Sequence, residues 1–342
     1  MEILEIAIIA LIKILIIVVL MLLTVAYLVY FERKISAWAQ NRVGPNRVGP
    51  AGLLQPFADV LKLLLKEDIV PAVATKSIHT LAPILALIVA FGTYAVIPIG
   101  PAIEVFGRKI SLVVADVNIG ILYTLALTSV GVYAITFSGW SSGSKYSLLG
   151  GIRSSAQMIS YEISMGFSIA GVVILAESLR PIDIVNAQSG LMWNVFVQPI
   201  GFITFVVAAF AEINRLPFDL PEAEPELVGG YHTEYSSMKF AGFFLAEYAN
   251  MIIASAMIIT LYLGGWQIPY IEKLGLPEYA VVALQVAGFF VKMGALLFFI
   301  IWVRWSIPRF RYDQLMNLGW KVMFPLSLVN LIWVAVLVML MN

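Results

Sequence analysis

Long uncharged apolar segments constrain this chain more than any other feature. A helix of about 20 predominantly apolar residues is long enough to cross the hydrocarbon core of a bilayer. The sequence contains eight candidate segments, at residues 10–31, 78–99, 117–138, 157–177, 194–212, 243–265, 280–303 and 323–341. We therefore predict an all-α fold, a polytopic transmembrane helical bundle of about eight spans.

The composition excludes the other fold classes. The chain is 61% hydrophobic and 12% charged, whereas soluble domains carry roughly 25% charged residues. Soluble cores could not hide such an apolar surplus, and the apolar runs are too long for barrel strands, which alternate over about 10 residues. The N-terminus lacks the basic region of a signal peptide, so the first span is expected to be retained. No domain-sized linker appears, and residues 1–342 are expected to form a single integral membrane domain.

The distribution of basic residues predicts the orientation. Alternate loops collect fifteen Lys and Arg residues, whereas the opposite loops hold four. Loops rich in Lys and Arg stay on the cytoplasmic side. Both termini are therefore expected on the outer side, and the acidic loop described below on the inner side.

The first inner loop contains a short amphipathic segment. After the tandem repeat Arg-Val-Gly-Pro within residues 42–50, apolar residues recur at helical spacing through 53–67, with Gln55, Asp59, Lys62 and Lys66 on the other face. This segment is too short and too charged to span. We predict an amphipathic helix in the interface plane; a surface helix packed on the bundle is the alternative.

An acidic loop at residues 213–238 follows the fifth candidate span. Together with the residue before it, the loop holds the carboxylates Glu212, Asp219, Glu222, Glu224, Glu226 and Glu234. Closely spaced acids titrate as a coupled set, and ionisable groups at membrane depth usually serve a function. Prolines recur every fourth residue, and the apolar neighbours Phe218, Leu220, Leu227, Val228 and Tyr231 indicate partial burial. We predict a store or relay of protons; a solvated loop without a task is the alternative.

Four charged residues lie within or at the ends of the candidate spans. They are Glu162, Glu212, Glu247 and Lys292. An unpaired charge at such a position costs several kcal/mol, so each is expected to have a partner. Structural ion pairs that lock helices together are the alternative to a functional role.

The residue inventory argues against a redox centre in this chain. The sequence has no cysteine, and its two histidines, His79 and His232, lie far apart. Iron–sulfur ligation, thiolate metal sites and paired-histidine haem sites are therefore not expected, and no metal site is predicted. Any redox centre that this protein serves is therefore expected on another chain or on a diffusing molecule. The few basic residues are tied to the membrane edge, which disfavours nucleic acid as a partner.

The last inner loop alternates basic and aromatic residues through 304–321. Lipid headgroup contact explains the charge but not the segment around Arg309, Arg311, Asp313 and Gln314. We interpret these four residues as an element that docks a partner subunit.

Several of these segments resemble one known family. Residues 32–34, 42–50, 52–59, 62–68, 211–236, 308–316 and 320–321 match the motifs of the family formed by the H subunit of bacterial NADH-quinone oxidoreductase, called subunit 1 in mitochondrial complex I. The matches extend from the first span to the last. Val60, where the family pattern has glycine, and the Trp305-Ser306 pair are small departures.

The resemblance implies a role in a proton-translocating NADH:quinone oxidoreductase. In that family this subunit joins the membrane arm to the hydrophilic arm, forms much of the quinone tunnel and begins a chain of coupling carboxylates. Carried over to this sequence, the coupling acids are Glu162, Glu212, Asp219, Glu222, Glu224, Glu226 and Glu247. The residues of the quinone tunnel are Arg33, Arg42, Arg47, Phe57, Asp59 and Arg215.

The resemblance also implies partners and location. Quinone is the substrate, this chain binds no cofactor, and iron–sulfur clusters and flavin belong to partner subunits. The partners are the iron–sulfur and quinone-headgroup subunits, the small and antiporter-like membrane subunits, and membrane lipids, in the cell inner membrane. Three alternatives stay open: a homologous subunit of a ferredoxin-driven complex or membrane-bound hydrogenase, a stand-alone cation transporter, and a purely structural anchor.

Overall fold

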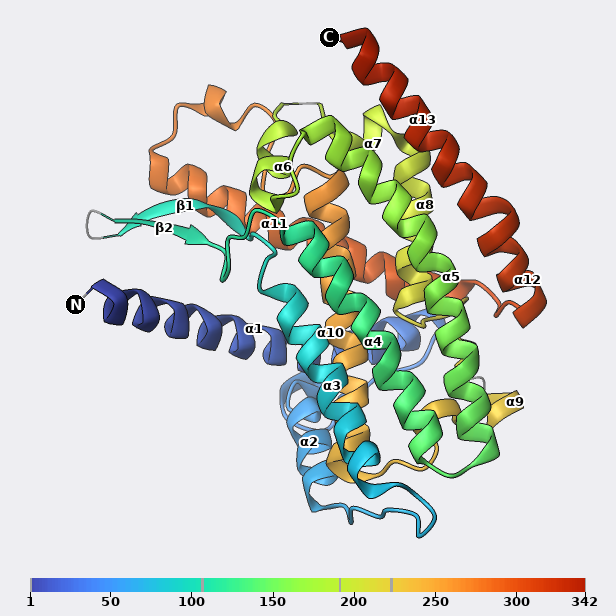
Figure 1. The fold of residues 1–342 in the computed structure, drawn as a ribbon. Helices are drawn as coiled ribbons and strands as arrows, with labels where there is room; N and C mark the ends of the chain where they lie inside the picture. The colour runs from blue at the N-terminus through green and yellow to red at the C-terminus, as the bar shows by residue number, and fades with distance from the viewer. Residues whose placement is uncertain (1, 106–107, 191, 222–223, 342) are drawn as a thin grey trace.

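Helices make up nearly all of the regular structure in the computed structural model, which describes residues 2–105, 108–190, 192–221 and 224–341 (Figure 1). Within these residues, seven helical segments are long and apolar enough to cross a membrane. They are α1 (Glu2–Ala39), α3 (Lys76–Tyr94), α4 (Gly120–Ser141), α5 (Lys145–Ala176), α10 (Ser237–Tyr262), α11 (Glu278–Ser306) and a last segment formed by α12 (Tyr312–Asn317), a π-helical turn (Leu318–Met323) and α13 (Phe324–Met341). The prediction of an all-α polytopic membrane bundle is confirmed.

The fifth candidate segment differs from the continuous span that the sequence predicts. It is divided into α7 (Asn194–Val197) and α8 (Pro199–Glu212), with Gln198 in a non-helical conformation between them. The ring of Pro199 disfavours helical geometry in the residue before it, while proline itself suits the first position of a helix. The 14 residues of α8 extend about 21 Å, which is shorter than the hydrocarbon core of about 30 Å.

The amphipathic segment forms α2 (Gln55–Leu65), two residues shorter at each end than predicted, after a 3-10 turn at Pro50–Gly52. Leu61 and Leu65 are 59% and 87% exposed, so α2 has an uncovered apolar face. The end of α2 is fixed to the start of α10, because Ser237 Oγ donates a hydrogen bond to the carbonyl of Leu63 at 3.0 Å.

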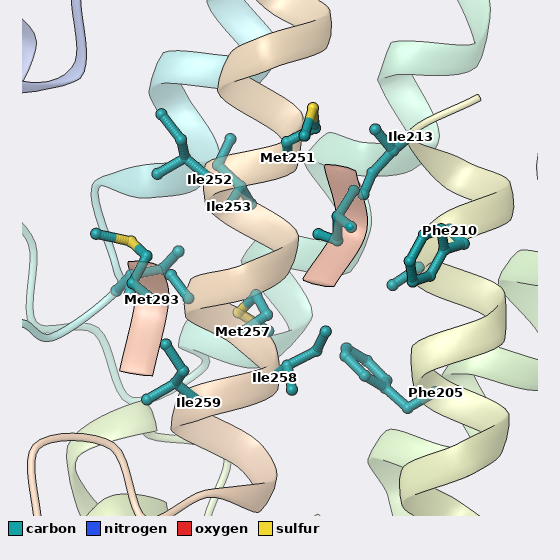
Figure 2. Close-up of a cluster of buried hydrophobic side chains, with 14 of the residues drawn as sticks. Phe205, Phe210, Ile213, Met251, Ile252, Ile253, Met257, Ile258, Ile259 and Met293 are labelled. Carbon is teal, nitrogen blue, oxygen red and sulfur yellow. The ribbon is translucent and has the colours of Figure 1, made fainter. Parts of the chain in front are cut away.

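The centre of the bundle is α10. In its most apolar window 72% of residues are buried, against 11% for α1. Figure 2 shows Met251 and Ile258 of α10 on the side that faces Phe205 and Phe210 of α8, all within one core cluster. Because α10 is enclosed by the other helices, polar side chains on it must find partners inside the protein.

The connection between α3 and α4 contains a hairpin that the sequence analysis did not predict. Strands β1 (Gly100–Val105) and β2 (Arg108–Leu112) pair antiparallel, with Ile103 opposite Ile110. A further short helix, α6 (Pro181–Ala187), follows α5.

Candidate functional site

The acidic loop begins with a turn that is held from inside the bundle. Helix α8 ends at Glu212, and Asn214 adopts a left-handed conformation with φ of 57°, which asparagine tolerates at the end of a helix. The buried Gln157 of α5 donates from Nε2 to the carbonyls of Ala211 and Phe218, both at 2.8 Å. This bridge directs the next side chain, Arg215, into the protein rather than into solvent.

Arg215 lies at the centre of a buried cluster of charges. Its Nη1 donates to both carboxylate oxygens of Glu32 at 3.0 and 3.1 Å, and its Nε lies 2.5 Å from Oε1 of Glu247. Glu32 also accepts hydrogen bonds from the Tyr248 hydroxyl at 2.7 Å and from Nη1 of Arg304. The side chains of Arg215 and Glu32 are 3% and 7% exposed. Two guanidinium groups and two carboxylates balance in charge, which makes their shared burial tolerable.

The electrostatics of the cluster keep Arg215 charged. Burial alone would lower the pKa of Arg215, but Glu247 and Glu32 outweigh it, so that the pKa rises above that of a free guanidinium. The guanidinium also lies over the ring of Tyr248, 4.3 Å from its centre, a favourable cation–π contact.

A cavity among α3, α4, α5, α8 and α10 adjoins the cluster. Glu212 and Glu247 both line it, together with the polar side chains Thr128 and Asn250 and otherwise mostly apolar residues. Glu247 thus belongs to both features: it pairs with Arg215 and faces the cavity.

Glu162 extends this group of acids. Its Oε1 accepts a hydrogen bond from Ser129 of α4, while Glu212 is hydrogen-bonded to the neighbouring Thr128 and lies within electrostatic range of Glu162. Three of the predicted coupling acids thus lie around one region of the bundle: Glu162 and Glu212 are within electrostatic range of each other, and Glu247 lines the same cavity as Glu212.

The other predicted coupling acids lie elsewhere. Asp219 is buried and accepts a hydrogen bond from Arg309 Nη2 at 2.7 Å. Glu226 is exposed and pairs with Arg153 at 2.6 Å. Glu222 and the side chain of Glu224 lie outside the described residues.

The predicted partial burial of the loop holds at most positions. Phe218, Leu220, Leu227 and Tyr231 are at most 5% exposed, whereas Val228 is 65% exposed. The described part of the loop is therefore partly buried, as predicted, and Val228 is the exposed one of the five apolar residues on which that prediction is based.

The docking segment divides into two parts. Arg309 is fixed to the acidic loop by its hydrogen bond to Asp219. The amide of the next residue, Phe310, donates a hydrogen bond to the carbonyl of Pro217 in that loop at 3.2 Å. Arg311 and Asp313 have side chains 74% and 65% exposed, and Gln314 is also exposed, accepting a hydrogen bond from the backbone of Arg311 at 3.1 Å. Of the four docking residues, these last three are free to meet another chain.

The predicted tunnel residues do not form one group. Arg33 of α1 pairs with Asp59 of α2 at 2.6 Å, and Phe57 packs edge-on against α1, 6.5 Å from the ring centre of Tyr27. Arg42 and Arg47 are exposed in the loop between α1 and α2. The sixth, Arg215, lies in the buried cluster.

Several members of this site carry no sequence signal of a functional role. They are Glu32, Ser129, Gln157, Tyr248 and Arg304. Glu32 and Arg304 each stand at the end of an apolar helix, where a charge ordinarily reaches the interface. No local signal joins two residues 272 positions apart.

Known proteins resemble this chain along most of its length. The family model described as NADH dehydrogenase matches residues 12–335. NADH-quinone oxidoreductase subunit 8 of Rhodothermus marinus is 54% identical over 91% of this chain and 92% of its own length. An NADH-quinone oxidoreductase H subunit of Cytophaga hutchinsonii is 53% identical over 90% of each chain, and that of Salinibacter ruber is 51% identical over 93% of this chain and 92% of its own length. Because the family model covers nearly the whole membrane bundle, the chain belongs to the NADH dehydrogenase family.

Proposed function

We propose that this chain is the membrane subunit of a proton-translocating NADH-quinone oxidoreductase that guides quinone to its reduction site and couples the reduction to proton movement. It lies in the cell inner membrane with both termini on the outer side. Electrons reach the quinone from iron–sulfur and flavin groups on partner subunits, because this sequence has no cysteine for cluster ligation.

The position of Glu247 carries the proposal. Glu247 contacts the guanidinium of Arg215, which also pairs with Glu32 of the first span. The side chain of Glu247 also lines the cavity that Glu212 lines. A change of charge beside Arg215 therefore acts on Glu247, and through Glu247 it reaches the cavity. Helix α2, joined to α1 by Arg33 and Asp59, supplies an amphipathic surface at the same end of α1, which suits a lipophilic substrate that arrives from the bilayer.

The coupling follows from electrostatics. Reduction of the quinone by two electrons adds negative charge near the buried cluster, and this charge competes with Glu247 for Arg215. A carboxylate that loses its cationic partner binds a proton more tightly. Glu247 then takes a proton from the set that it shares with Glu212 and Glu162, while the quinone takes up its own two protons to become quinol. The altered proton distribution changes the acidic loop, which signals to neighbouring membrane subunits.

The coupling role is tested with Glu212→Gln and Glu247→Gln in the assembled complex, reconstituted in liposomes. The measurements are the rate of quinone reduction by NADH and the number of protons moved per electron. We expect fewer protons per electron in both variants. Glu278→Gln is the control, since Glu278 is exposed, lies outside the cavity lining and is not among the predicted coupling acids. Wild-type stoichiometry in both cavity variants would exclude these acids from the relay.

The quinone path is tested separately by photoaffinity labelling with an inhibitor that competes with quinone. We expect labelled peptides from α1 and α2, with Phe57 among them. Labelling confined to other helices would contradict the proposed path while leaving the coupling role untouched.

A further inference from the structure

The ammonium group of Lys292 sits in a cage of backbone oxygens. Its Nζ donates hydrogen bonds to the carbonyls of Leu263 at 2.8 Å, Gly265 at 3.0 Å and Gln267 at 2.8 Å. The same nitrogen lies 4.4 Å from the ring centre of Trp193. All three donors of the ammonium are therefore satisfied by carbonyl oxygens, and an aromatic face covers it.

The chain after α10 is built so that these carbonyls converge. Gly264 and Gly265 both have positive φ, 70° and 54°, a conformation that glycine adopts without strain. A Cβ on Gly264 would lie 2.6 Å from Nε1 of Trp193, and the amide of Gly264 donates to Gln188 Oε1 at 3.0 Å. The backbone thus turns after the end of α10 and directs the carbonyls of the C-cap residue Leu263 and of Gly265 and Gln267, in the segment that follows, toward one point.

Backbone dipoles, rather than a carboxylate, stabilise the charge in this cage. No ion pair joins Lys292 to a carboxylate in the part of the chain that the structure describes. Rings of backbone carbonyls bind K⁺ in channels by replacing its water shell, and aromatic faces bind ammonium ions. Three carbonyl oxygens and one aromatic face around Lys292 Nζ are thus the kinds of group that bind monovalent cations elsewhere.

We propose that this cage is a monovalent-cation site in which Lys292 acts as a tethered occupant, and that it would accept ammonium, K⁺ or a primary alkylammonium ion if the side chain were removed. The occupied cage joins the end of α10 to α11 on the side away from the acidic loop. At the other end the same helices are joined through the cluster of Arg215, Glu247 and Arg304. Lys292 is thus a positioning residue that fixes one end of the pair of helices.

The test uses Lys292→Ala in the assembled complex. This change removes Cγ, Cδ, Cε and Nζ, so n-propylammonium replaces the missing atoms. We measure the melting temperature in choline, n-propylammonium, ammonium and potassium salts at equal ionic strength. The variant should melt below the wild type in choline, and n-propylammonium should raise its melting temperature saturably. The wild type should show no such difference between the salts.

Lys292→Met is the matched control, because its side chain still fills the space but has no charge. It should melt below the wild type, with no recovery in n-propylammonium. The proposal is overturned if Lys292→Ala melts equally in all four salts, or if Lys292→Met melts like the wild type.

If Lys292→Ala does not assemble, Trp193→Phe and Trp193→Leu replace it. Trp193→Phe keeps an aromatic face over the ammonium, so its melting temperature should lie closer to that of the wild type than the melting temperature of Trp193→Leu does. Equal melting temperatures of the two variants would contradict the proposal that the aromatic face stabilises the ammonium. None of these measurements involves quinone, so their outcome is independent of the proposed function. Activity that follows the recovered stability in n-propylammonium would link the cage to that function.

Discussion

The buried charge cluster gives the sharpest prediction, through the change Glu32→Gln. Glu32 accepts hydrogen bonds from Arg215, Tyr248 and Arg304 with a side chain that is 7% exposed. The substitution places an amide donor against these donors and leaves two guanidinium groups facing one carboxylate. Removing one partner from a buried ion pair destabilises a protein by about 3–5 kcal/mol. At about 2 °C per kcal/mol for a large chain, the melting temperature should fall by about 6–10 °C.

The assay is thermal melting of the purified complex, compared with Glu226→Gln. Both changes neutralise a glutamate that pairs with arginine, but Glu226 has a side chain that is 53% exposed. Exposed ion pairs contribute about 0–1 kcal/mol, so Glu226→Gln should shift the melting temperature by less than about 2 °C. The double variant Glu32→Gln, Arg304→Met should recover part of the loss, because it restores the charge balance. Equal melting of Glu32→Gln and Glu226→Gln would refute the reasoning.

Three further outcomes follow from the geometry. Arg180 donates a hydrogen bond to Asp116 and holds the pKa of that carboxyl below its usual range. The resulting stabilisation is complete above the pKa of Asp in the unfolded chain, roughly 3.9, and is lost as the pH falls through the lower pKa of Asp116 in the folded protein. The melting temperatures of the wild type and of Asp116→Asn should therefore converge as the pH falls below about 3.9. Gln157→Leu leaves the carbonyl of Phe218 without its side-chain donor, while the carbonyl of Ala211 still accepts from the amide of Asn214 at 3.4 Å. The change should destabilise the protein by about 1–3 kcal/mol, seen as faster hydrogen exchange in residues 213–221; unchanged exchange there would contradict the bridge. Gly171→Ala places a Cβ 2.7 Å from Oε1 of Gln198 and should cost about 1–3 kcal/mol, measured by melting. Gly166→Ala, which meets no atom within 4 Å, is the control and should melt at or slightly above the wild-type temperature, because alanine favours a helix over glycine by about 0.5–1 kcal/mol.

The helical elements could be predicted from the sequence because hydropathy and periodicity are properties of each segment alone. The apolar runs marked the long spans, and the periodicity of residues 53–67 marked α2 to within two residues at each end. Sequence reasoning missed the interruption at Gln198, although the following proline is a local signal for it. It also missed the hairpin of β1 and β2, since short strands on a membrane protein carry little periodicity.

The partners of the charged residues could not be predicted from the sequence. Glu162, Glu212 and Glu247 could be selected because a carboxylate at membrane depth is unusual, and the structure places them around one region of the bundle. Lys292 was expected to have a partner, but that partner is a set of backbone carbonyls, which no side-chain pattern reveals.

The sequence by itself determined that this chain is a helical membrane protein with acids at the edge of the bundle, because hydropathy acts on each segment independently of the others. Only the tertiary structure decided which charges meet. Glu32, Arg215, Glu247 and Arg304 come from four distant segments, and their burial is tolerated because the two carboxylates balance the two guanidinium groups. Such a balance depends on how the helices pack, and it leaves no trace in any one of them.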